Sequence, residues 1–178
     1  MKYFKKMRGT TQSPPRVSLV EVMWSWIGAF FGIAAVGLIH TSILDQLGLT
    51  LVLGSLGATA VLVFGAVRSP LAQPRNVLGG HVFSALIGVF AHQTLGTIPW
   101  LAGAAAVATA VAVMHLTKTL HPPGGATALI AVVGGDSVHG LGYLYVFVPT
   151  GLGAALLLFI ALVVNNIPKN RRYPEYWL

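Results

Sequence analysis

The chain has 178 residues, of which 55% are hydrophobic and only 8% are charged. A soluble domain carries roughly 25% charged residues, so eleven basic and four acidic side chains cannot cover a water-facing surface of this size. The composition therefore indicates one membrane-embedded domain. The absence of cysteine excludes a disulfide framework and a thiolate metal site. The net charge of +7 does not indicate nucleic-acid binding, because the basic residues lie beside and between apolar segments.

Six apolar segments follow one another along the chain. A helix needs about 20 residues to cross a ~30 Å hydrocarbon core, and four of the six approach that length. The fifth has only 14 residues, or about 21 Å of helix, and Gly54, Ser55 and Gly57 interrupt the second. Because unpaired strands are not tolerated in lipid, the sequence predicts an all-α membrane protein. The predicted segments are residues 19–39, 49–67, 77–95, 100–117, 122–135 and 141–164.

The positions of Lys and Arg favour six crossings of the membrane. All eleven lie before the first segment, after the sixth, or in the connections that follow the second and fourth segments. Six crossings place them all on one side, which the positive-inside rule identifies as the cytoplasm. If the second and fifth segments dipped in and returned, the basic residues would be divided between the two sides. We therefore expect a multi-pass protein of a bacterial inner membrane with both termini cytoplasmic. The predicted regions are a basic tail (1–18), a transmembrane domain (19–164, with halves at about 19–95 and 96–164) and a second basic tail (165–178).

A four-residue sequence occurs twice. GATA at 57–60 recurs at 125–128, an offset of 68 residues, each time in the middle segment of a three-segment half. Because three crossings reverse the direction of the chain, two such halves would be inverted relative to each other, as in many secondary transporters. Chance recurrence in a chain rich in Gly and Ala is the alternative. The sequence predicts two inverted three-segment repeats whose second and fifth segments are short and broken.

The start of the fifth segment is suited to binding an anion. A residue that precedes proline is disfavoured in the helical region, so we expect His121 and Pro122 to be extended and Pro123 to begin the helix. The next amides, at 124–126, have no partner in a preceding turn and lie at the positive end of the helix. Thr127 adds a hydroxyl one turn further on. The residues predicted to bind the anion here are His121, Pro122, Pro123, Gly124, Gly125 and Thr127.

The second segment offers a matching helix end. Gly54 and Gly57 would expose backbone amides, and Ser55 and Thr59 would supply hydroxyl groups. An inverted repeat would bring this end and the one at Pro123 together near the midplane of the membrane. Small residues also let helices pack closely, and the spacing alone leaves both interpretations open.

The connection SPLAQPRNVLGGH, residues 69–81, combines Arg, Asn, Gln and His. Pro70 and Pro74 predict a rigid turn. Arg75 carries a planar fork of donors that can bind an oxyanion through two hydrogen bonds, and Asn76 follows it. We expect Arg75 and Asn76 to contribute to the anion site, with a topology-setting charge as the alternative for Arg75.

The histidines are divided between the two predicted faces. Six crossings place three of them near the inner face, and no carboxylate joins any of them, so we expect no metal site and no cofactor. His121 abuts the proposed site and titrates near neutral pH, so it can add charge for the anion and carry a coupled proton. The predicted inner histidines are His81, His115 and His121, and the outer ones are His40, His92 and His139.

The acidic residues exclude other functions. Glu21 opens the first segment, and Asp45, Asp136 and Glu175 lie in connections or the tail. None lies inside a span, so the acidic sites of cation pumps are missing. The chain also lacks the paired carboxylates or the Ser/His arrangement of an intramembrane enzyme. We expect a protein that is not an enzyme.

Three motifs together resemble the HPP family of integral membrane proteins. They are GSLGATAVLVFG, SPLAQPRNVLGGH and TKTLHPPGGATAL, and the family takes its name from a motif that matches residues 121–123. The resemblance covers about residues 18–164. It implies nitrite transport, which is associated with members in chloroplast envelopes and cyanobacteria. The family is usually described with four spanning helices, so four and six crossings both stay open. This chain has Gly124 where relatives often have alanine.

The sequence thus predicts a transporter of a small monovalent oxyanion, with nitrite as the best single candidate. Helix ends starting at Gly54 and Pro123 would hold the ion, and one half would rock against the other to alternate access. A passive anion channel is one alternative, and a non-transporting scaffold that senses an anion is another. The expected partners are the inorganic anion, the lipid bilayer and further copies of the chain in a homo-oligomer.

Overall fold

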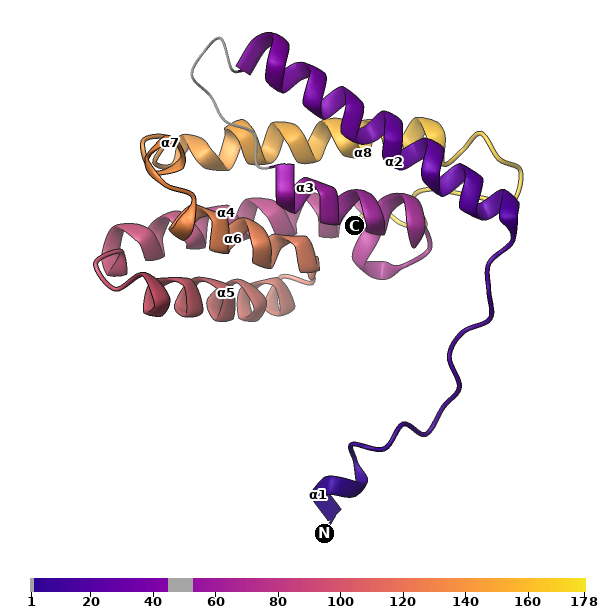
Figure 1. Ribbon diagram of the computed structural model, residues 1–178, viewed down its shortest axis with the longest axis horizontal. Helices are drawn as coiled ribbons and strands as arrows, with labels where there is room; N and C mark the ends of the chain where they lie inside the picture. Colours follow the sequence, from indigo (N-terminus) through magenta and orange to yellow (C-terminus); the bar gives the residue numbers. More distant parts are fainter. Residues whose placement is uncertain (1, 45–52) are drawn as a thin grey trace.

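The computed structural model describes residues 2–44 and 53–178 (Figure 1). Every regular element in these residues is helical, which confirms the predicted all-α class. Asp45 and residues 49–52 of the predicted second segment lie outside the described residues. In chain order the elements are α1 Lys2–Lys5, α2 Leu19–Ile39, η1 His40–Leu44, α3 Leu53–Ala60, η3 Val61–Gly65, η4 Pro70–Ala72, α4 Pro74–Leu95, α5 Pro99–Leu116, α6 Pro122–Val133, α7 Asp136–His139, η5 Val146–Gly151 and α8 Leu152–Val164.

Among the described residues, three helical stretches are long and apolar enough to cross a membrane. They are Leu19–Ser42, Pro99–Leu116 and Val146–Val164. The apolar stretches Gly54–Gly65 and Pro122–Val133 are shorter, and at 1.5 Å per residue each extends only about 18 Å. These two short helices therefore need neighbouring elements to complete a path across a hydrocarbon core of ~30 Å.

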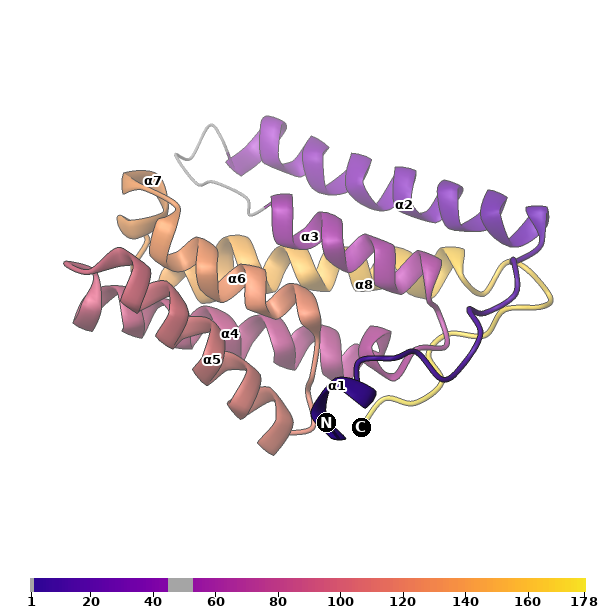
Figure 2. The same cartoon turned by 60° about the horizontal axis from the view of Figure 1, so that its bottom comes forward.

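The connections that carry Lys and Arg meet at one end of the bundle, because successive long elements alternate in direction (Figures 1 and 2). At this end, Arg68 donates from Nη2 to the carbonyl oxygen of Asn170 at 3.2 Å. Arg75 donates from Nη2 to the carbonyl oxygen of Thr117 at 2.9 Å. The connection before α4, the end of α5 and the stretch after α8 are thus joined. This is the clustering of basic connections that the charge pattern predicts for the cytoplasmic side.

Large apolar side chains lie on the outside of the bundle, the reverse of what a soluble protein shows. Helix α2 alone exposes Trp26, Phe30 and Phe31 by 64%, 53% and 56%. The interior combines apolar core clusters with a set of buried polar side chains. A surface of this kind suits contact with lipid and not with water. The buried polar residues are Ser55, Thr59, Gln73, Asn76, His81, Ser84, Thr119, His121, Thr127, Thr150, Asn165 and Arg171.

Helix α2 packs on the bundle through two glycines one turn apart. A Cβ added at Gly32 would lie 2.8 Å from the ring of Phe64 in η3, and one added at Gly28 would overlap the same ring. At Gly32 the added atom would also lie 2.9 Å from Leu157 in α8. Small residues four positions apart let helices approach this closely in membranes. The two glycines therefore hold α2 against both η3 and α8.

Helix α4 is the central element and contacts α5, α6 and α8. Small residues at every fourth position, Gly80, Ser84 and Gly88, face α6. A Cβ added at Gly124 of α6 would lie 2.7 Å from the Gly80 carbonyl oxygen and 2.8 Å from Ser84 Oγ. The added atom at Gly88 would lie 2.6 Å from the carbonyl oxygen of Ala128. The start of α6 is thus packed directly against the backbone of α4.

The sixth predicted segment, 141–164, is not one continuous helix. Its helical part begins at Val146, and Val148 has an extended backbone with φ −129° and ψ 117°. The cause is Pro149, because proline disfavours helical backbone at the residue before it. The helix resumes and continues through α8. The prediction missed this break because the residues on both sides of it are apolar.

The connection 69–81 is also shorter than predicted. Helix η4 occupies Pro70–Ala72, and α4 begins at Pro74, three residues before the predicted start. Both prolines stand at the first positions of these helices, where a missing N–H costs no hydrogen bond. Arg75, Asn76 and His81 are therefore helical residues with fixed directions, and only a few residues form the turn.

Residues 165–178, expected as a basic tail, pack back across the connection that precedes α4. The hydroxyl of Tyr173 donates to the carbonyl oxygen of Ala72 at 2.6 Å, and that of Tyr176 donates to the carbonyl oxygen of Pro70 at 3.1 Å. Burial raises the pKa of the Tyr173 phenol, so the hydroxyl stays protonated as a donor. We call residues 165–178 the C-terminal strap.

Candidate functional site

The two copies of GATA meet at a buried histidine. Thr59 Oγ1 lies 2.7 Å from His81 Nε2, and Thr127 Oγ1 lies 2.7 Å from His81 Nδ1. All three residues are 0% exposed. Helix α3 carries Thr59, α4 carries His81 and α6 carries Thr127, and α3 and α6 run side by side in opposite directions (Figure 2). The repeated threonines thus bind opposite nitrogens of a single imidazole.

His121 completes this cluster from the position just before α6. Its Nε2 lies 3.0 Å from Thr59 Oγ1, and its ring centroid lies 5.0 Å from that of His81. Its Nδ1 lies 2.8 Å from the carbonyl oxygen of Leu71. The His121 backbone is extended, with φ −142° and ψ 104°, as predicted for a residue that precedes proline. We call Thr59, His81, His121 and Thr127 the His–Thr cluster.

One assignment of protons satisfies all four ring nitrogens when both imidazoles are neutral. The Leu71 carbonyl can only accept, so His121 Nδ1 carries a proton and His121 Nε2 accepts from the hydroxyl of Thr59. The Thr59 oxygen then accepts from His81 Nε2. His81 Nδ1 in turn accepts from the hydroxyl of Thr127. The cluster is therefore a one-way chain of hydrogen bonds that links the two halves of the protein.

The same cluster has acceptors for one additional proton. Protonated His121 would donate from Nε2 to Thr59, whose hydroxyl would then donate to His81 Nε2. His81 would donate from Nδ1 to Thr127, and the Thr127 hydroxyl would turn to the carbonyl oxygen of Pro123, 3.2 Å away. Every donor in this second arrangement still has an acceptor. The geometry thus provides two hydrogen-bonded states that differ by one proton.

The start of α6 differs from the prediction in two respects. The helix begins one residue early, at Pro122, and the Gly124 amide donates to the carbonyl oxygen of His121 at 2.8 Å. Gly124 is also packed against α4. By contrast, a Cβ added at Gly125 would meet its nearest neighbour only at 3.9 Å. Gly124 therefore matches the close-packing interpretation, whereas Gly125 makes only an ordinary contact with Val107.

In α3 the hydroxyl residues face the core and the glycines face outward. Ser55 is 1% exposed, and its carbonyl oxygen lies 3.1 Å from Thr59 Oγ1. A Cβ added at Gly57 would meet nothing within 4 Å, and one at Gly54 would meet only Ile130 of α6, at 4.0 Å. The start of α3 thus lies beside the second half of α6. The two helix starts therefore lie at opposite ends of the antiparallel pair, not together as the inverted repeat predicted, and the His–Thr cluster lies where the end of α3 meets the first half of α6.

Arg75 and Asn76, predicted to bind the anion, hold the connection that leads to His121. Arg75 contacts the carbonyl oxygen of Thr117, a favourable place for a cation because it is the negative end of α5. Asn76 Nδ2 donates to the carbonyl oxygen of Leu120 at 2.9 Å. Both contacts are to backbone. Their effect is to position the residues directly before His121.

His81 is the member of the cluster that sequence reasoning did not assign to the site. Two signals for it were present. The charge pattern placed His81 at the same face as His121, and His81 follows the pair Gly79-Gly80. A Cβ at Gly80 would overlap the Cβ of His121, so the glycine admits the second imidazole. Neither signal shows which helices pack against each other, because that depends on the tertiary structure.

A second histidine pair joins the last turn of α4 to α7. The rings of His92 and His139 are stacked, with centroids 3.6 Å apart and planes inclined by 15°. Each pair joins two histidines that the charge pattern places at the same face. In the ranges 2–44 and 53–178, no group of three or more His, Cys, Asp or Glu residues could hold a metal ion.

Comparison with known proteins agrees with the resemblance seen in the motifs. Residues 14–174 match the family described as HPP, transmembrane region. Two transmembrane proteins of Dictyostelium discoideum are similar to this chain, one 43% identical over 180 residues and the other 42% identical over 182 residues. Each comparison covers 99% of this chain but only 58% and 64% of the respective relatives, so the chain spans about three fifths of their length. No solved structure matches the chain. With its apolar helices and its match to the family over residues 14–174, the chain is a multi-pass membrane protein that belongs to the HPP family.

Proposed function

We propose that the protein carries a small monovalent oxyanion, with nitrite as the best single candidate, across a membrane together with a proton. The observation that carries this proposal is the convergence of the two short helices on the His–Thr cluster. Short helices in corresponding positions of two halves form the substrate sites of many secondary transporters. The anion class follows from the nitrite transport that the HPP resemblance implies.

The start of α6 supplies groups that suit an anion. A helix N-terminus carries roughly half a positive charge, and backbone N–H groups at such an end bind phosphate and carboxylate groups. Gly125 lies at this end without close packing, since an added Cβ would meet its nearest neighbour, Val107, only at 3.9 Å, and His121 immediately precedes the helix. Nitrite is small and accepts hydrogen bonds through both oxygens. It therefore suits the positive end of a helix beside a protonated imidazole, whose charge attracts the anion while its two N–H groups stay bound to Leu71 and Thr59.

A proton on the cluster would lower the electrostatic cost of moving the anion. Taking a lone charge from water into the interior of a membrane protein is expensive. A pair of imidazolium and nitrite is neutral overall and avoids most of that cost. Histidine suits this role because its imidazole can take up a proton on one nitrogen and release it on the far side. Because Thr59 is hydrogen-bonded to both His121 and His81, the proton can be held on either imidazole.

Alternating access would arise from motion of one group of helices against the other. Helices α4, α5 and α6 pack on one another, and α2 packs on α3 and α8. Thr59 belongs to the second group, whereas His81, His121 and Thr127 belong to the first or to its connection. The two hydrogen bonds of Thr59 thus cross the boundary between the groups. Their rearrangement on protonation is the step that we expect to permit movement.

The test is a flux assay on the full chain reconstituted in lipid vesicles. Nitrite, nitrate, formate and chloride would be compared, each with and without an inward proton gradient. We expect the gradient to accelerate nitrite uptake and His121→Ala to reduce that uptake at least tenfold. His115→Ala is the matched control, because His115 is an exposed histidine.

The outcomes separate the mechanisms. Uptake that depends on His121 but ignores the proton gradient would replace the proton-coupled transporter with a passive channel. Failure of all four anions to cross, with folded protein in the vesicles, would remove transport from the proposal.

An anion-sensing scaffold is the second candidate, and the C-terminal strap favours it. The strap binds the carbonyl oxygen of Ala72 through Tyr173, and the neighbouring carbonyl oxygen of Leu71 binds His121. A change of hydrogen bonding at His121 would therefore be transmitted through residues 71 and 72 to the strap. Under this candidate, nitrite would alter hydrogen exchange in residues 165–178 while no flux is measured. Flux without any change in the strap would favour the transporter.

A further inference from the structure

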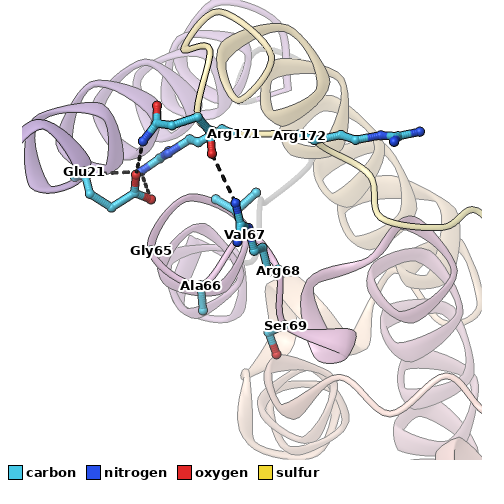
Figure 3. A pocket seen from close by; sticks show the side chains of 9 residues that line it. Glu21, Gly65, Ala66, Val67, Arg68, Ser69, Arg171 and Arg172 are labelled. Atoms are coloured by element: carbon cyan, nitrogen blue, oxygen red, sulfur yellow. Dashed lines mark hydrogen bonds and ion pairs between the residues drawn. The ribbon is translucent and has the colours of Figure 1, made fainter. Parts of the chain in front are cut away.

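A cavity of about 400 Å³ lies at the basic end of the bundle, where α2 begins, η3 ends and the C-terminal strap returns (Figure 3). It shares no lining residue with the His–Thr cluster. Its charged lining consists of three arginines and one glutamate, a formal charge of +2. The polar side chains that line it are Glu21, Arg68, Ser69, Asn170, Arg171 and Arg172.

The glutamate is paired with Arg171 within the protein, so the net charge of +2 comes from the two other arginines. Arg171 Nη2 lies 2.7 Å from Glu21 Oε1, and the Arg171 side chain is only 3% exposed. Arg171 Nη1 also donates to Asn165 Oδ1 at 3.0 Å. The Nε of Arg171 is buried and has no hydrogen-bond partner within the described part of the chain. A buried N–H without a partner is unusual and points to a group that the chain itself does not supply.

The two other arginines have donors to spare. Arg68 and Arg172 are exposed, and Arg68 uses Nη2 to bind the carbonyl oxygen of Asn170 (Figure 3). A guanidinium group has five N–H donors in a fixed plane. The hydroxyl of Ser69 accepts from the Leu71 amide at 3.2 Å and keeps its own proton for donation. Arg68 and Ser69 therefore supply unused N–H and O–H donors at the cavity, whereas the Arg172 side chain extends away from Glu21 and Arg68 and adds positive charge at the rim (Figure 3).

We propose that this cavity binds a phosphate group, that of an anionic phospholipid in the adjoining leaflet. Guanidinium forks match the oxygens of phosphate, and basic pockets between helices on the cytoplasmic side bind lipid headgroups. The first turn of α2 beside the cavity exposes Leu19 by 86% and Val22 by 50%. These side chains give the acyl chains an apolar surface next to the headgroup. Inorganic phosphate has the same chemistry and is the alternative source.

The experiment measures binding to the purified full chain by thermal stabilisation in detergent and by native mass spectrometry. The probes are dioleoyl phosphatidic acid, dioleoyl phosphatidylcholine and inorganic phosphate. The test variant combines Arg68→Gln with Arg172→Gln, which leaves the pair of Arg171 and Glu21 intact. The control variant combines Lys6→Gln with Arg16→Gln, removing the same charge from exposed positions outside the cavity.

We expect phosphatidic acid to raise the melting temperature of the unmodified chain and of the control variant, and to bind the test variant at least fivefold more weakly. Phosphatidylcholine should bind all three chains weakly. Stabilisation by inorganic phosphate alone, lost in the test variant, would support the same site with a soluble ligand. Equal binding of phosphatidic acid to the test and control variants would overturn the proposal, because general attraction to a basic surface would then explain it.

Discussion

Thr59 and Thr127 occupy equivalent positions in two copies of the same four-residue sequence, and they bind opposite ring nitrogens of His81, each at 2.7 Å. The relationship joins α3 to α6 through α4. The four-residue repeat is a weak sequence signal because its residues are common, but in the structure it corresponds to a buried contact between the two halves. In addition, Thr59 joins His81 to His121, because its hydroxyl is hydrogen-bonded to both imidazoles.

Replacing Thr59 by valine should impair both stability and transport. The hydroxyl disappears while the branched shape is kept, so His81 Nε2 and His121 Nε2 lose their common partner. Each unsatisfied buried group costs about 1–3 kcal/mol, and we expect a corresponding fall in the free energy of unfolding and at least a tenfold loss of nitrite uptake. Thr59→Ser keeps the hydroxyl and should retain most uptake. Thermal unfolding and vesicle uptake measure the two effects, and normal uptake by Thr59→Val would remove the cluster from the mechanism.

His81→Gln should uncouple anion movement from the proton. Glutamine offers a donor and an acceptor to the two threonines but cannot take up a proton. We expect folded protein whose nitrite uptake no longer responds to an inward proton gradient. The ratio of uptake with and without the gradient measures this. The matched control is His115→Gln at an exposed position, and an unchanged ratio in His81→Gln would assign the proton elsewhere.

Gly80→Ala should displace His121, whereas Gly57→Ala should be tolerated. A Cβ at Gly80 would overlap the Cβ of His121, but one at Gly57 would meet nothing within 4 Å. Alanine in a helix is favoured over glycine by about 0.5–1 kcal/mol, so Gly57→Ala should raise the melting temperature slightly. Gly80→Ala should destabilise by about 1–3 kcal/mol, the usual cost of overpacking. Melting curves of both variants compare them, and equal stability would contradict the described contact of α4 with His121.

Arg75→Ala should reduce nitrite uptake by loosening the connection before His121. Arg75 binds the carbonyl oxygen of Thr117, and a hydrogen bond of this kind contributes about 0.5–1.5 kcal/mol. Arg75→Lys retains a cation at the end of α5 and should restore part of the uptake. If Arg75 bound the anion directly as a fork, lysine would restore little. Uptake by the three chains at several nitrite concentrations distinguishes positioning from direct binding.

Tyr173→Phe should weaken the C-terminal strap and change its response to alkaline pH. The hydroxyl donates to the carbonyl oxygen of Ala72, so its loss should cost about 1 kcal/mol. Burial raises the pKa of Tyr173. Its contribution to stability is therefore complete below the unfolded pKa of about 10 and declines as pH rises above that value. Melting temperatures between pH 7 and pH 11 should fall less steeply in Tyr173→Phe than in the unmodified chain. The same slope in both would show that another group controls alkaline stability.

Helix boundaries were predictable where an apolar run ends at a strong local signal. Helix α2 occupies residues 19–39 as predicted, because Ser18 caps its start by accepting from the Glu21 amide. The start of α6 was predicted to within one residue from the two prolines. The break at Val148 was missed because Pro149 stands among apolar residues. The predicted start of α4 lies three residues too late, because two prolines and the polar residues between them resemble a longer turn.

The amino-acid sequence by itself determined the membrane environment, the helical class and the clustering of basic connections at one end. It also selected His121 and the two threonines as candidate site residues, and the structure places them in contact with one histidine. These predictions depend on composition and on local backbone preferences, which act over a few residues. Only the tertiary structure decided that His81 joins the site, that Arg75 and Asn76 bind backbone, and that residues 165–178 pack as a strap. Each of these depends on which faces of distant helices meet. Close packing at glycines such as Gly80 and Gly124 determines which helix faces meet. The residues that pack against these glycines lie far from them in the chain.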